Sequence, residues 1–511
     1  METAHFFYHV GRDRRDLLAK IQYNKQTMLH IGRNIITLLI SKILGAAIIF
    51  LVYTRLIQYL GPESAGQYGL LAAYLTVFSF FVDLGMQQLV IKKISEDKTH
   101  VAKYLGNYLS IQFGLGLFFM VVMDVIVYNA GYEPLIRHSL YIIALGLFLS
   151  SMTMPLMAVI NGFQKLSIIA RVNFFNSLVN AAMMLVAVTF TKSIFFLAFI
   201  PVVVAGIDIL IYSIIVHRKF TPFQFQFDRA FVKQMFIWNM PFMLLTIFSI
   251  YNRIDTLILP HLRNFTENGY YTAVYKFWDT LAFLPAVVAA ALYPYFSDIL
   301  SRGQKEEAAK TIATYTRYMI ALAVPISVGA FILSRKLTVA FFGAEFAPAA
   351  PALWLLVLAV SVLMVYVPVN SMIISQRTHT ATKVTGLTLL FNLGANFLLV
   401  PKFGFVMAAG ITLVSEMIQL IGYTWVVQRK VVSFPYFKNF VKPVLAGGGM
   451  AAIVYLVQGL NLALVIALGA IVYSIGLFVL RFFQKEDWEL LVASINFRQK
   501  VEPDNIRGGN L

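Results

Sequence analysis

The sequence predicts an all-α integral membrane protein with about fourteen transmembrane helices. Of its 511 residues, 59% are apolar and only 13% are charged, which is unlike a soluble domain. The apolar residues form runs of about 20, the length that crosses a bilayer as a helix. The gaps between the runs alternate in charge: every second gap, beginning with the N-terminus, is rich in Lys and Arg, holding 31 of them against seven in the others. Basic loops stay in the cytoplasm, so we expect a cytoplasmic-membrane protein with both termini inside.

The runs place each span in order, with odd-numbered spans running outward and even-numbered spans running inward. The expected spans are 34–57, 67–90, 105–128, 138–161, 170–190, 193–215, 236–260, 270–298, 311–334, 350–374, 381–400, 403–426, 441–459 and 461–481. Three joints are tight, and Thr191-Lys192, Pro401-Lys402 and Asn461 carry their turn signals.

Short motifs recur at matching points of the first twelve spans. Gly66-Gln-Tyr68 opens span two, and Gly269-Tyr-Tyr271 opens span eight, 203 residues later. Because six is an even number of spans, the halves have the same orientation, which predicts a parallel repeat of two six-helix lobes. The expected domains are a basic cytoplasmic segment 1–33, an N-lobe 34–215, a cytoplasmic linker 216–235, a C-lobe 236–426, two further helices in 441–481, and a cytoplasmic tail 482–511.

Several charged residues lie inside the expected spans, where an uncompensated charge is costly and usually functional. The bases are Lys42, in the inner half of span one, and Arg253 and Lys276, in the outer halves of spans seven and eight. The acids that must face a bundle interior or a water-filled cavity are Asp83, Asp255, Asp279 and Glu416.

Two readings of these charges stay open. Arg253-Ile-Asp255 and Lys276-Phe-Trp-Asp279 lie at similar depth on adjacent spans, so they could form a static ion-pair network. Alternatively, Arg253 and Lys276 offer charge and hydrogen-bond donors to an anionic substrate, with an Arg fork suited to phosphate. The acids are then proton or sodium coupling sites, or partners of the bases. Tyr251, Tyr275 and Trp278, at the same depth, would stack on sugar rings or form an interfacial aromatic belt.

Other chemistries are not expected. The chain has no cysteine and therefore no disulfide or thiolate. It also lacks a GxxxxGK[ST] phosphate loop, so no built-in ATPase is expected. We expect no catalytic residue, no metal site and no cofactor. The net charge of +17 is explained by the basic loops and by contact with anionic lipid, so nucleic acid is not an expected partner. A membrane glycosyltransferase or polymerase is the least favoured class, because the expected external loops are short.

The chain resembles bacterial polysaccharide flippases of the Wzx type, within the multidrug/oligosaccharidyl-lipid/polysaccharide exporter superfamily. The resemblance covers roughly residues 30–430. It is carried by Ser41-Lys42-Ile-Leu-Gly45, Leu60-Gly61-Pro-Glu-Ser-Ala-Gly66-Gln-Tyr68, Asp83-Leu-Gly85, Arg253-Ile-Asp255, Gly269-Tyr-Tyr-Thr-Ala-Val-Tyr-Lys276, Phe342-Gly-Ala-Glu-Phe-Ala-Pro-Ala-Ala-Pro351 and Pro401-Lys-Phe-Gly404.

The resemblance implies transfer of a lipid-linked oligosaccharide, on an undecaprenyl-type diphosphate carrier, from the inner to the outer leaflet. Two lobes would form a V and alternate access to a central cavity, in which Lys42, Arg253 and Lys276 would meet diphosphate or acidic sugars. A polysaccharide polymerase and glycosyltransferases are the implied protein partners. A cation-coupled drug exporter and a peptidoglycan-precursor flippase remain the alternatives in the same superfamily. The interior charge, with acids outnumbering bases, departs from what a diphosphate cavity implies.

Overall fold

A computed structural model describes residues 44–191, 193–222, 224–248, 251–435, 439–484 and 487, and every regular element in these ranges is a helix. The first described helix is Leu44–Asp83. The others are α2 (Met86–Glu96), α3 (Val101–Asn129), α4 (Pro134–Gly162), α5 (Leu166–Val186), the π-helical turn η1 (Ala187–Thr191), α6 (Ile194–Lys219), α7 (Arg229–Phe248), α8 (Tyr251–Leu262), α9 (Phe265–Leu281), α10 (Phe283–Ser301), α11 (Lys305–Phe342), the 3₁₀ turn η2 (Ala344–Ala349), α12 (Ala350–Lys430), α13 (Val441–Val457) and α14 (Leu462–Val479).

The predicted fold class is confirmed. Ten helical segments of the described chain are long and apolar enough to cross a membrane. Many large apolar side chains on these helices are exposed, among them Phe118 (58%), Leu398 (72%) and Val479 (70%). Such faces are stable in lipid, where the helix satisfies its own backbone hydrogen bonds.

The helix Leu44–Asp83 is 40 residues long, and it contains two spans rather than one. In a straight helix Tyr53 and Tyr68 would lie about 22 Å apart. Their ring centroids are instead 6.3 Å apart, so the chain folds back between them. Gly61, between these tyrosines, has a φ of 70°, a backbone conformation that glycine adopts without strain. Spans one and two therefore form a hairpin that turns at Gly61.

α12, with 81 residues, folds back in the same way. The hydroxyl of Tyr366 donates to Glu416 at 2.7 Å, although 50 residues separate them. A Cβ placed on Gly422 would lie 2.9 Å from a methyl group of Val384. The last fold falls at Gly404, where φ is 72°. The turn predicted at Pro401-Lys402 is thus present, and α12 accounts for spans ten to twelve.

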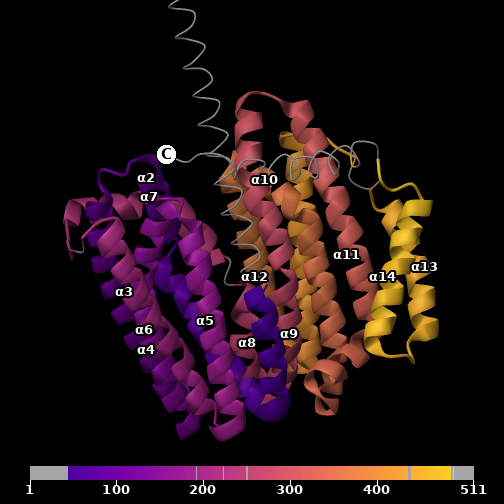
Figure 1. The fold of residues 1–511 in the computed structure, drawn as a ribbon, viewed down its shortest axis with the longest axis horizontal. Helices are drawn as coiled ribbons and strands as arrows, with labels where there is room; N and C mark the ends of the chain where they lie inside the picture. Colours follow the sequence, from indigo (N-terminus) through magenta and orange to yellow (C-terminus); the bar gives the residue numbers. More distant parts are fainter. Residues whose placement is uncertain are drawn as a thin grey trace, which may run out of the picture. The chain divides into compact units, whose positions relative to one another are not determined.

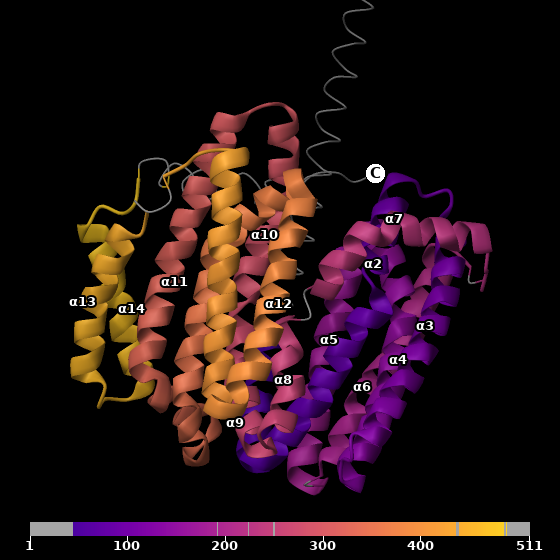
Figure 2. The ribbon, with the colours of Figure 1, turned by 180° about the vertical axis from the view of Figure 1, so that it is seen from behind.

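The helices form two compact units, each described by itself. One contains the chain as far as Lys276, together with Phe341–Phe346 and Thr385–Ala408; the other contains Phe277–Ala340, Ala347–Val384 and the chain from Ala409. In the first unit α3, α4 and α6 lie side by side in both ribbon views (Figure 1 and Figure 2). Their core is apolar and includes Tyr108, Val159 and Tyr212, none of which is exposed.

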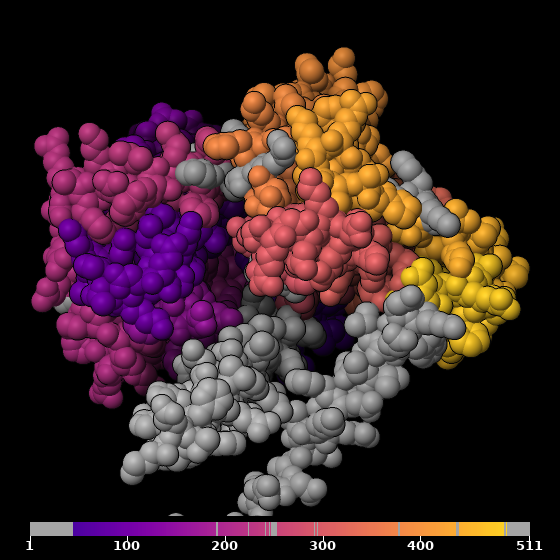
Figure 3. Space-filling view, turned by 90° about the horizontal axis from the view of Figure 1, so that it is seen from above, coloured from indigo at the N-terminus to yellow at the C-terminus, as the bar shows by residue number. Residues whose placement is uncertain are grey.

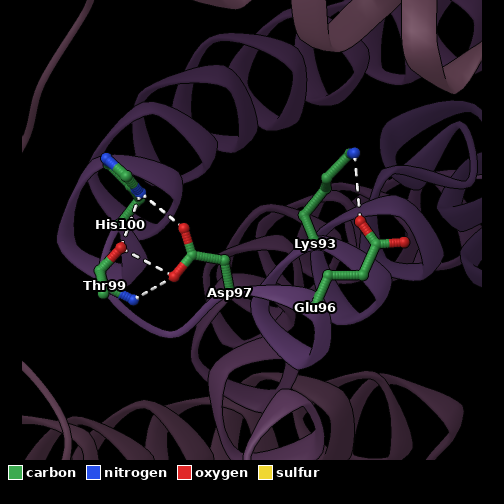
Figure 4. A network of polar contacts seen from close by, with 5 residues as sticks. All are labelled: Lys93, Glu96, Asp97, Thr99 and His100. Atoms are coloured by element: carbon green, nitrogen blue, oxygen red, sulfur yellow. Dashed lines mark hydrogen bonds and ion pairs between the residues drawn. The ribbon is translucent and has the colours of Figure 1, made fainter.

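In the first unit, polar contacts fix the loop that joins α2 to α3, which is on the predicted cytoplasmic side. Figure 4 shows Asp97 accepting hydrogen bonds from the backbone and hydroxyl of Thr99, at 2.8 and 2.7 Å, and contacting His100 at 2.9 Å. The backbone bond from Thr99 is the largest of the effects that lower the pKa of Asp97 to about 2. Lys93 pairs with Glu96 at 3.2 Å in the same network. Asp97 therefore stays ionised throughout the physiological pH range.

The N-terminus of α7 is capped by Asp228, which also contacts the start of α3. Asp228 accepts from the backbone N–H of Phe231 at 3.1 Å and pairs with Lys103 at 3.1 Å. These two contacts, led by the first, lower the pKa of Asp228. A carboxylate at this position satisfies an amide that the helix itself leaves unpaired. The view from above shows magenta atoms beside indigo atoms of the earlier segment (Figure 3).

In the second unit, α13 and α14 pack on each other and on α11. Tyr473 donates to the carbonyl of Ala321 at 2.8 Å, and Lys336 donates to the carbonyls of Gln458 and Leu460. Asn461 caps α14 by accepting from Ala463 at 2.9 Å, so the turn expected there is present. The two helices that fall outside the predicted repeat are therefore held by polar contacts at several levels.

A buried ion pair joins α11 to the segment after α14, and its loss is expected to destabilise the protein. Arg317, which is 6% exposed, pairs with Asp487 at 2.5 Å and donates to the carbonyl of Phe482 at 3.3 Å. Arg317→Ala would remove the cation from a buried carboxylate, to which the hydroxyl of Tyr318 and the backbone of Gln484 also donate. Breaking a buried ion pair lowers the free energy of unfolding by about 3–5 kcal/mol. The check is thermal unfolding of the purified protein in detergent.

Arg302→Ala is the matched control, because Arg302 pairs with Asp298 at 2.9 Å while 66% of its side chain is exposed. An exposed pair within one helix contributes about 0.3–0.5 kcal/mol. Equal melting temperatures for the two variants would contradict the structural role assigned to Arg317.

Candidate functional site

Two glycines that the sequence marks as a repeat touch each other. A Cβ placed on Gly66 would overlap the carbonyl oxygen of Phe265 and lie 2.8 Å from the amide nitrogen of Gly269. A Cβ on Gly269 would overlap the carbonyl oxygen of Pro62 and lie 3.0 Å from the nitrogen of Gly66. The same offset of 203 residues relates Pro62 to Phe265 and Gly66 to Gly269. We call this reciprocal backbone contact of Pro62, Gly66, Phe265 and Gly269 the glycine contact.

Hydrogen bonds and a third glycine extend the glycine contact. The buried amide of Asn268 donates to the carbonyl of Gly66 at 2.7 Å. The hydroxyl of Tyr53 donates to the carbonyl of Thr272 at 3.2 Å. A Cβ on Gly69 would lie 2.9 Å from the Cβ of Thr272. Small residues let two helices approach until their backbones touch, as they do here between the first hairpin and α9.

The turns around the glycine contact are also tied together. Gln58 donates to the carbonyl of Phe341 at 2.9 Å, and Arg263 donates to that of Pro401 at 2.9 Å. Glu267 pairs with Arg263 at 2.8 Å and accepts from the backbone of Phe405 at 3.0 Å. All these turns join an odd-numbered span to the next even-numbered one, so the predicted topology places them on the outer side. The first unit thus holds the glycine contact within a set of cross-linked turns.

Arg253 and Lys276 lie on the inward side of the glycine contact, along α8 and α9. The guanidinium of Arg253 lies 4.7 Å from the ring centre of Tyr275, and Lys276 Nζ lies 5.0 Å from that of Tyr53. A cation over an aromatic face is attracted by the ring quadrupole, more strongly when water is excluded. Lys276 is seven residues beyond Gly269, so about 10 Å of helix separates them. The two cations are therefore held by tyrosines at membrane depth.

Asp255 belongs to the same cluster. It is 1% exposed and accepts a 2.5 Å hydrogen bond from the hydroxyl of Tyr271. The rings of Tyr271 and Tyr275 are 5.4 Å apart, so contacts run from Asp255 through both tyrosines to Arg253. The sequence placed Arg253 and Asp255 at the depth of α9, and α8 does bring both against that helix.

The remaining predicted site residues are spread over the molecule. Asp83 lies at the other end of span two, and Glu416 is fully buried in the second unit, where Tyr366 donates to it at 2.7 Å. Asp279 is half-buried on α9. Tyr275 and Trp278 are buried, with 2% and 6% exposed, and Arg253 covers the ring of Tyr275. Lys42 and the side chain of Tyr251 lie outside the part of the chain that the structure describes.

Sequence reasoning missed three of the tyrosines that contact the charged groups, namely Tyr53, Tyr108 and Tyr366. A signal for them exists in retrospect, because a charge buried in a membrane protein needs a donor or an aromatic face nearby. Nothing in the sequence says which of the 25 tyrosines supplies it. Among the described residues, no group of three or more His, Cys, Asp or Glu side chains is arranged to hold a metal ion.

A set of apolar spans that holds cations and carboxylates inside them is typical of a multi-pass membrane transporter. The chain belongs to the polysaccharide biosynthesis protein family, whose match covers residues 31–300. The family resemblance drawn from the sequence motifs is thereby confirmed.

Individual relatives and structures agree with this assignment. An uncharacterised membrane protein of Methanocaldococcus jannaschii is 24% identical over 263 residues, which are 49% of this chain and 52% of that protein. The chain thus spans about half the length of this relative. The probable low-salt glycan biosynthesis flippase Agl15 of Haloferax volcanii is 22% identical over 394 residues, covering 76% of this chain and 81% of the flippase.

Two solved structures show the same fold. The lipid II flippase MurJ, in an inward closed conformation, matches with a TM-score of 0.72 and 15% identity, over 87% of this chain and 98% of MurJ. An inward-facing multidrug resistance MATE family transporter matches with a TM-score of 0.60 and 14% identity, over 75% of this chain and 94% of the transporter. At this level of identity, the likeness concerns the fold alone.

Proposed function

We propose that this protein moves a lipid-linked oligosaccharide from the inner to the outer leaflet of the cytoplasmic membrane for surface polysaccharide synthesis. The family assignment supports a role in polysaccharide synthesis. The Haloferax relative is named as a probable glycan biosynthesis flippase, which supports the translocation of a glycan. The similarity to this relative extends over most of both chains. The observation that carries the proposal is the pair of cations, Arg253 and Lys276, held inside the spans beside the glycine contact. Cations at membrane depth suit a substrate with an anionic head and an apolar tail.

The proposed carrier is an undecaprenyl-type diphosphate. A guanidinium matches phosphate oxygens with a planar fork, and an ammonium adds a compact charge. The head group would cross through the protein while the acyl chain stays in lipid. Lys42, on the predicted inner half of span one, would be a third contact for it. The alternative is the lipid-linked peptidoglycan precursor, because the lipid II flippase MurJ has the same fold, although a shared fold does not select the substrate.

Transport would proceed by alternating access of the two predicted lobes. The glycine contact joins the predicted N-lobe to the predicted C-lobe, and it lies on the predicted outer side. It would close the outer exit while the substrate enters from inside, and it must separate for release. Asp83, Asp255, Asp279 and Glu416 are candidates for binding a proton or sodium ion that drives the cycle. Glycosyltransferases and a polymerase would supply and consume the substrate.

Deletion of the gene tests the function. We expect surface glycan to be lost and lipid-linked repeat units to accumulate facing the cytoplasm. The measurement combines glycan staining of whole cells with modification of the lipid-linked sugars by a membrane-impermeant reagent in oriented vesicles. Normal surface glycan together with altered drug susceptibility would favour the cation-coupled drug exporter. Lysis with accumulated cell-wall precursor would favour the peptidoglycan-precursor flippase.

A further inference from the structure

The second span is interrupted before it continues as α2. The helix Leu44–Asp83 ends at Asp83, and Leu84 and Gly85 then take φ values of 48° and 76°. This backbone reversal leaves carbonyl groups outside the helical pattern. Gln112 donates to the carbonyl of Val82 at 3.3 Å, and Asn239 donates to that of Leu84 at 2.7 Å. The two amide side chains come from α3 and α7, and they satisfy the carbonyl groups that the break leaves unpaired within the helix.

Gly85 is required at the break for two reasons. Its φ is one that side-chain-bearing residues rarely adopt, and a Cβ there would lie 2.8 Å from the carbonyl carbon of Phe242. The backbone of α7 therefore lies directly on the break. This packing places side chains of α7 opposite the end of the broken helix, where the carboxylate of Asp83 is located.

A cavity of about 480 Å³ opens beside the break, and its volume is that of a small-molecule site. Its lining combines one carboxylate, three neutral polar side chains and three apolar ones. The lining residues are Ser79, Phe80, Asp83, Gln88, Met154, Phe242 and Thr246.

The carboxylate of Asp83 is oriented by its neighbours. Its Oδ1 accepts from the hydroxyl of Tyr108 at 3.1 Å and from the backbone of Gln87 at 3.2 Å. Tyr108 is fully buried, so its ring and hydroxyl are fixed by packing. A carboxylate oriented in this way in a cavity wall is preorganised to accept hydrogen bonds from a ligand.

This lining fits the sugar part of a glycan better than it fits a bare cation. A sugar hydroxyl donates to a carboxylate in a strong charge-assisted bond, and the Ser, Thr and Gln side chains offer both donors and acceptors. The rings of Phe80 and Phe242 supply flat apolar surface for the C–H face of a sugar ring. A cation such as Ca²⁺ needs at least six converging oxygen ligands, whereas this cavity contains a single carboxylate.

The cavity lies at the opposite end of span two from the glycine contact. Seventeen residues separate Gly66 from Asp83, so about 25 Å of helix lies between them. The loop that follows α2 contains Lys98, and the first turn of α3 contains Lys103, which places the cavity on the predicted cytoplasmic side. We infer that the Asp83 cavity is a sugar-binding subsite that receives the first sugars of the lipid-linked glycan on the inner side. The inference rests on the proposed function, and it assigns Asp83 to substrate recognition rather than to ion coupling.

The test uses the absence of cysteine in the chain. Thr246→Cys places a single thiol in the cavity wall of the full-length protein, which is purified in detergent. The measured quantity is the rate at which a water-soluble methanethiosulfonate modifies this thiol. The probes are a lipid extract that contains the lipid-linked oligosaccharide, undecaprenyl diphosphate without sugars, sodium chloride, and tetraphenylphosphonium. We expect the glycan-bearing extract alone to slow modification.

Asp83→Asn in the Thr246→Cys background should weaken this protection by about tenfold or more in probe concentration, because a charge-assisted hydrogen bond is lost. Asp298→Asn removes an exposed carboxylate elsewhere and should leave protection unchanged. Equal protection by undecaprenyl diphosphate would mean that the site recognises the carrier, and protection by sodium or tetraphenylphosphonium would mean a cation site. Either result, or no protection at all, would overturn the inference.

The outcome is separable from that of the proposed function. If the wild-type gene restores surface glycan to a deletion strain but the glycan-bearing extract does not protect the thiol, the subsite is wrong and the flippase function stands. If the gene does not affect surface glycan, the function itself is wrong. Export by the Thr246→Cys variant is measured first, so that the purified protein is known to be active.

Discussion

A disulfide between cysteines placed at Gly69 and Thr272 is expected to reduce glycan export to the level of a deletion strain, and a reducing agent should restore it. A Cβ on Gly69 would lie 2.9 Å from the Cβ of Thr272, so the two helices must move apart slightly to reach the 3.5–4.5 Å of a disulfide. The bond would lock the first hairpin onto α9 beside the glycine contact. If this contact closes the outer exit, a locked contact keeps the substrate from leaving. The measurements are surface glycan and the extent of cross-linking in the same cells.

The control joins two helices that do not need to separate. A Cβ on Gly476 would lie 3.1 Å from the Cβ of Ala446, so Gly476→Cys with Ala446→Cys should cross-link α14 to α13. The native chain contains no cysteine, so each double variant has one pair only. Export should survive this second cross-link. Undiminished export with Gly69 and Thr272 fully cross-linked would show that the glycine contact does not open during transport.

Replacing Arg253 or Lys276 with Ala is expected to have the second large effect. Each change removes a charged donor that we propose for the diphosphate, and a hydrogen bond to a charged group contributes about 1.5–3 kcal/mol, or roughly ten- to a hundredfold in affinity. Arg253→Lys should recover part of the export, because it keeps the charge but not the planar fork. Surface glycan and the amount of inserted protein are measured together.

Tyr275→Leu separates substrate binding from structural bracing. It removes the ring under Arg253 and keeps the guanidinium, at a cost of about 0.5–2 kcal/mol in the cation–aromatic contact. If Arg253 binds substrate, its replacement by Ala should reduce export far more than Tyr275→Leu does at equal melting temperature. If both variants lose stability and export to the same degree, Arg253 is a brace for α8 and α9, and the ion-pair interpretation is correct.

Hydropathy and charge alternation were sufficient for the fold class, because each span must bury its own backbone hydrogen bonds in lipid and must be apolar to do so. The turns at Gly61, Pro401-Lys402 and Asn461 can also be predicted from the sequence, since each carries a residue that ends a helix or reverses the chain. The repeat motif predicted that Gly66 and Gly269 occupy equivalent points. It did not predict that they touch, because the distance between two helices depends on packing far along the chain.

The candidate site was predicted only in part. Arg253, Asp255 and Lys276 stand out because charged residues are rare within spans, and the structure places all three near the glycine contact. The partners of these residues are tyrosines. Tyrosines also occur in cores and interfaces, so the sequence does not show which of them contact the charged residues. The helix break at Asp83 was also not predicted from the sequence. Asp83-Leu-Gly85 resembles a family motif, but the amides that complete the break come from Gln112 and Asn239, both distant in sequence.

The glycine contact consists of peptide groups, and peptide groups do not ionise. Its strength should therefore be the same at any pH or salt concentration at which the protein is folded, and no coupling ion can loosen it directly. A proton or sodium ion would have to act one layer further in, where Tyr271, two residues from Gly269, donates to Asp255. The glycine contact would then open only when α9 moves, and the ion-sensitive group would lie on a neighbouring turn of the same helix.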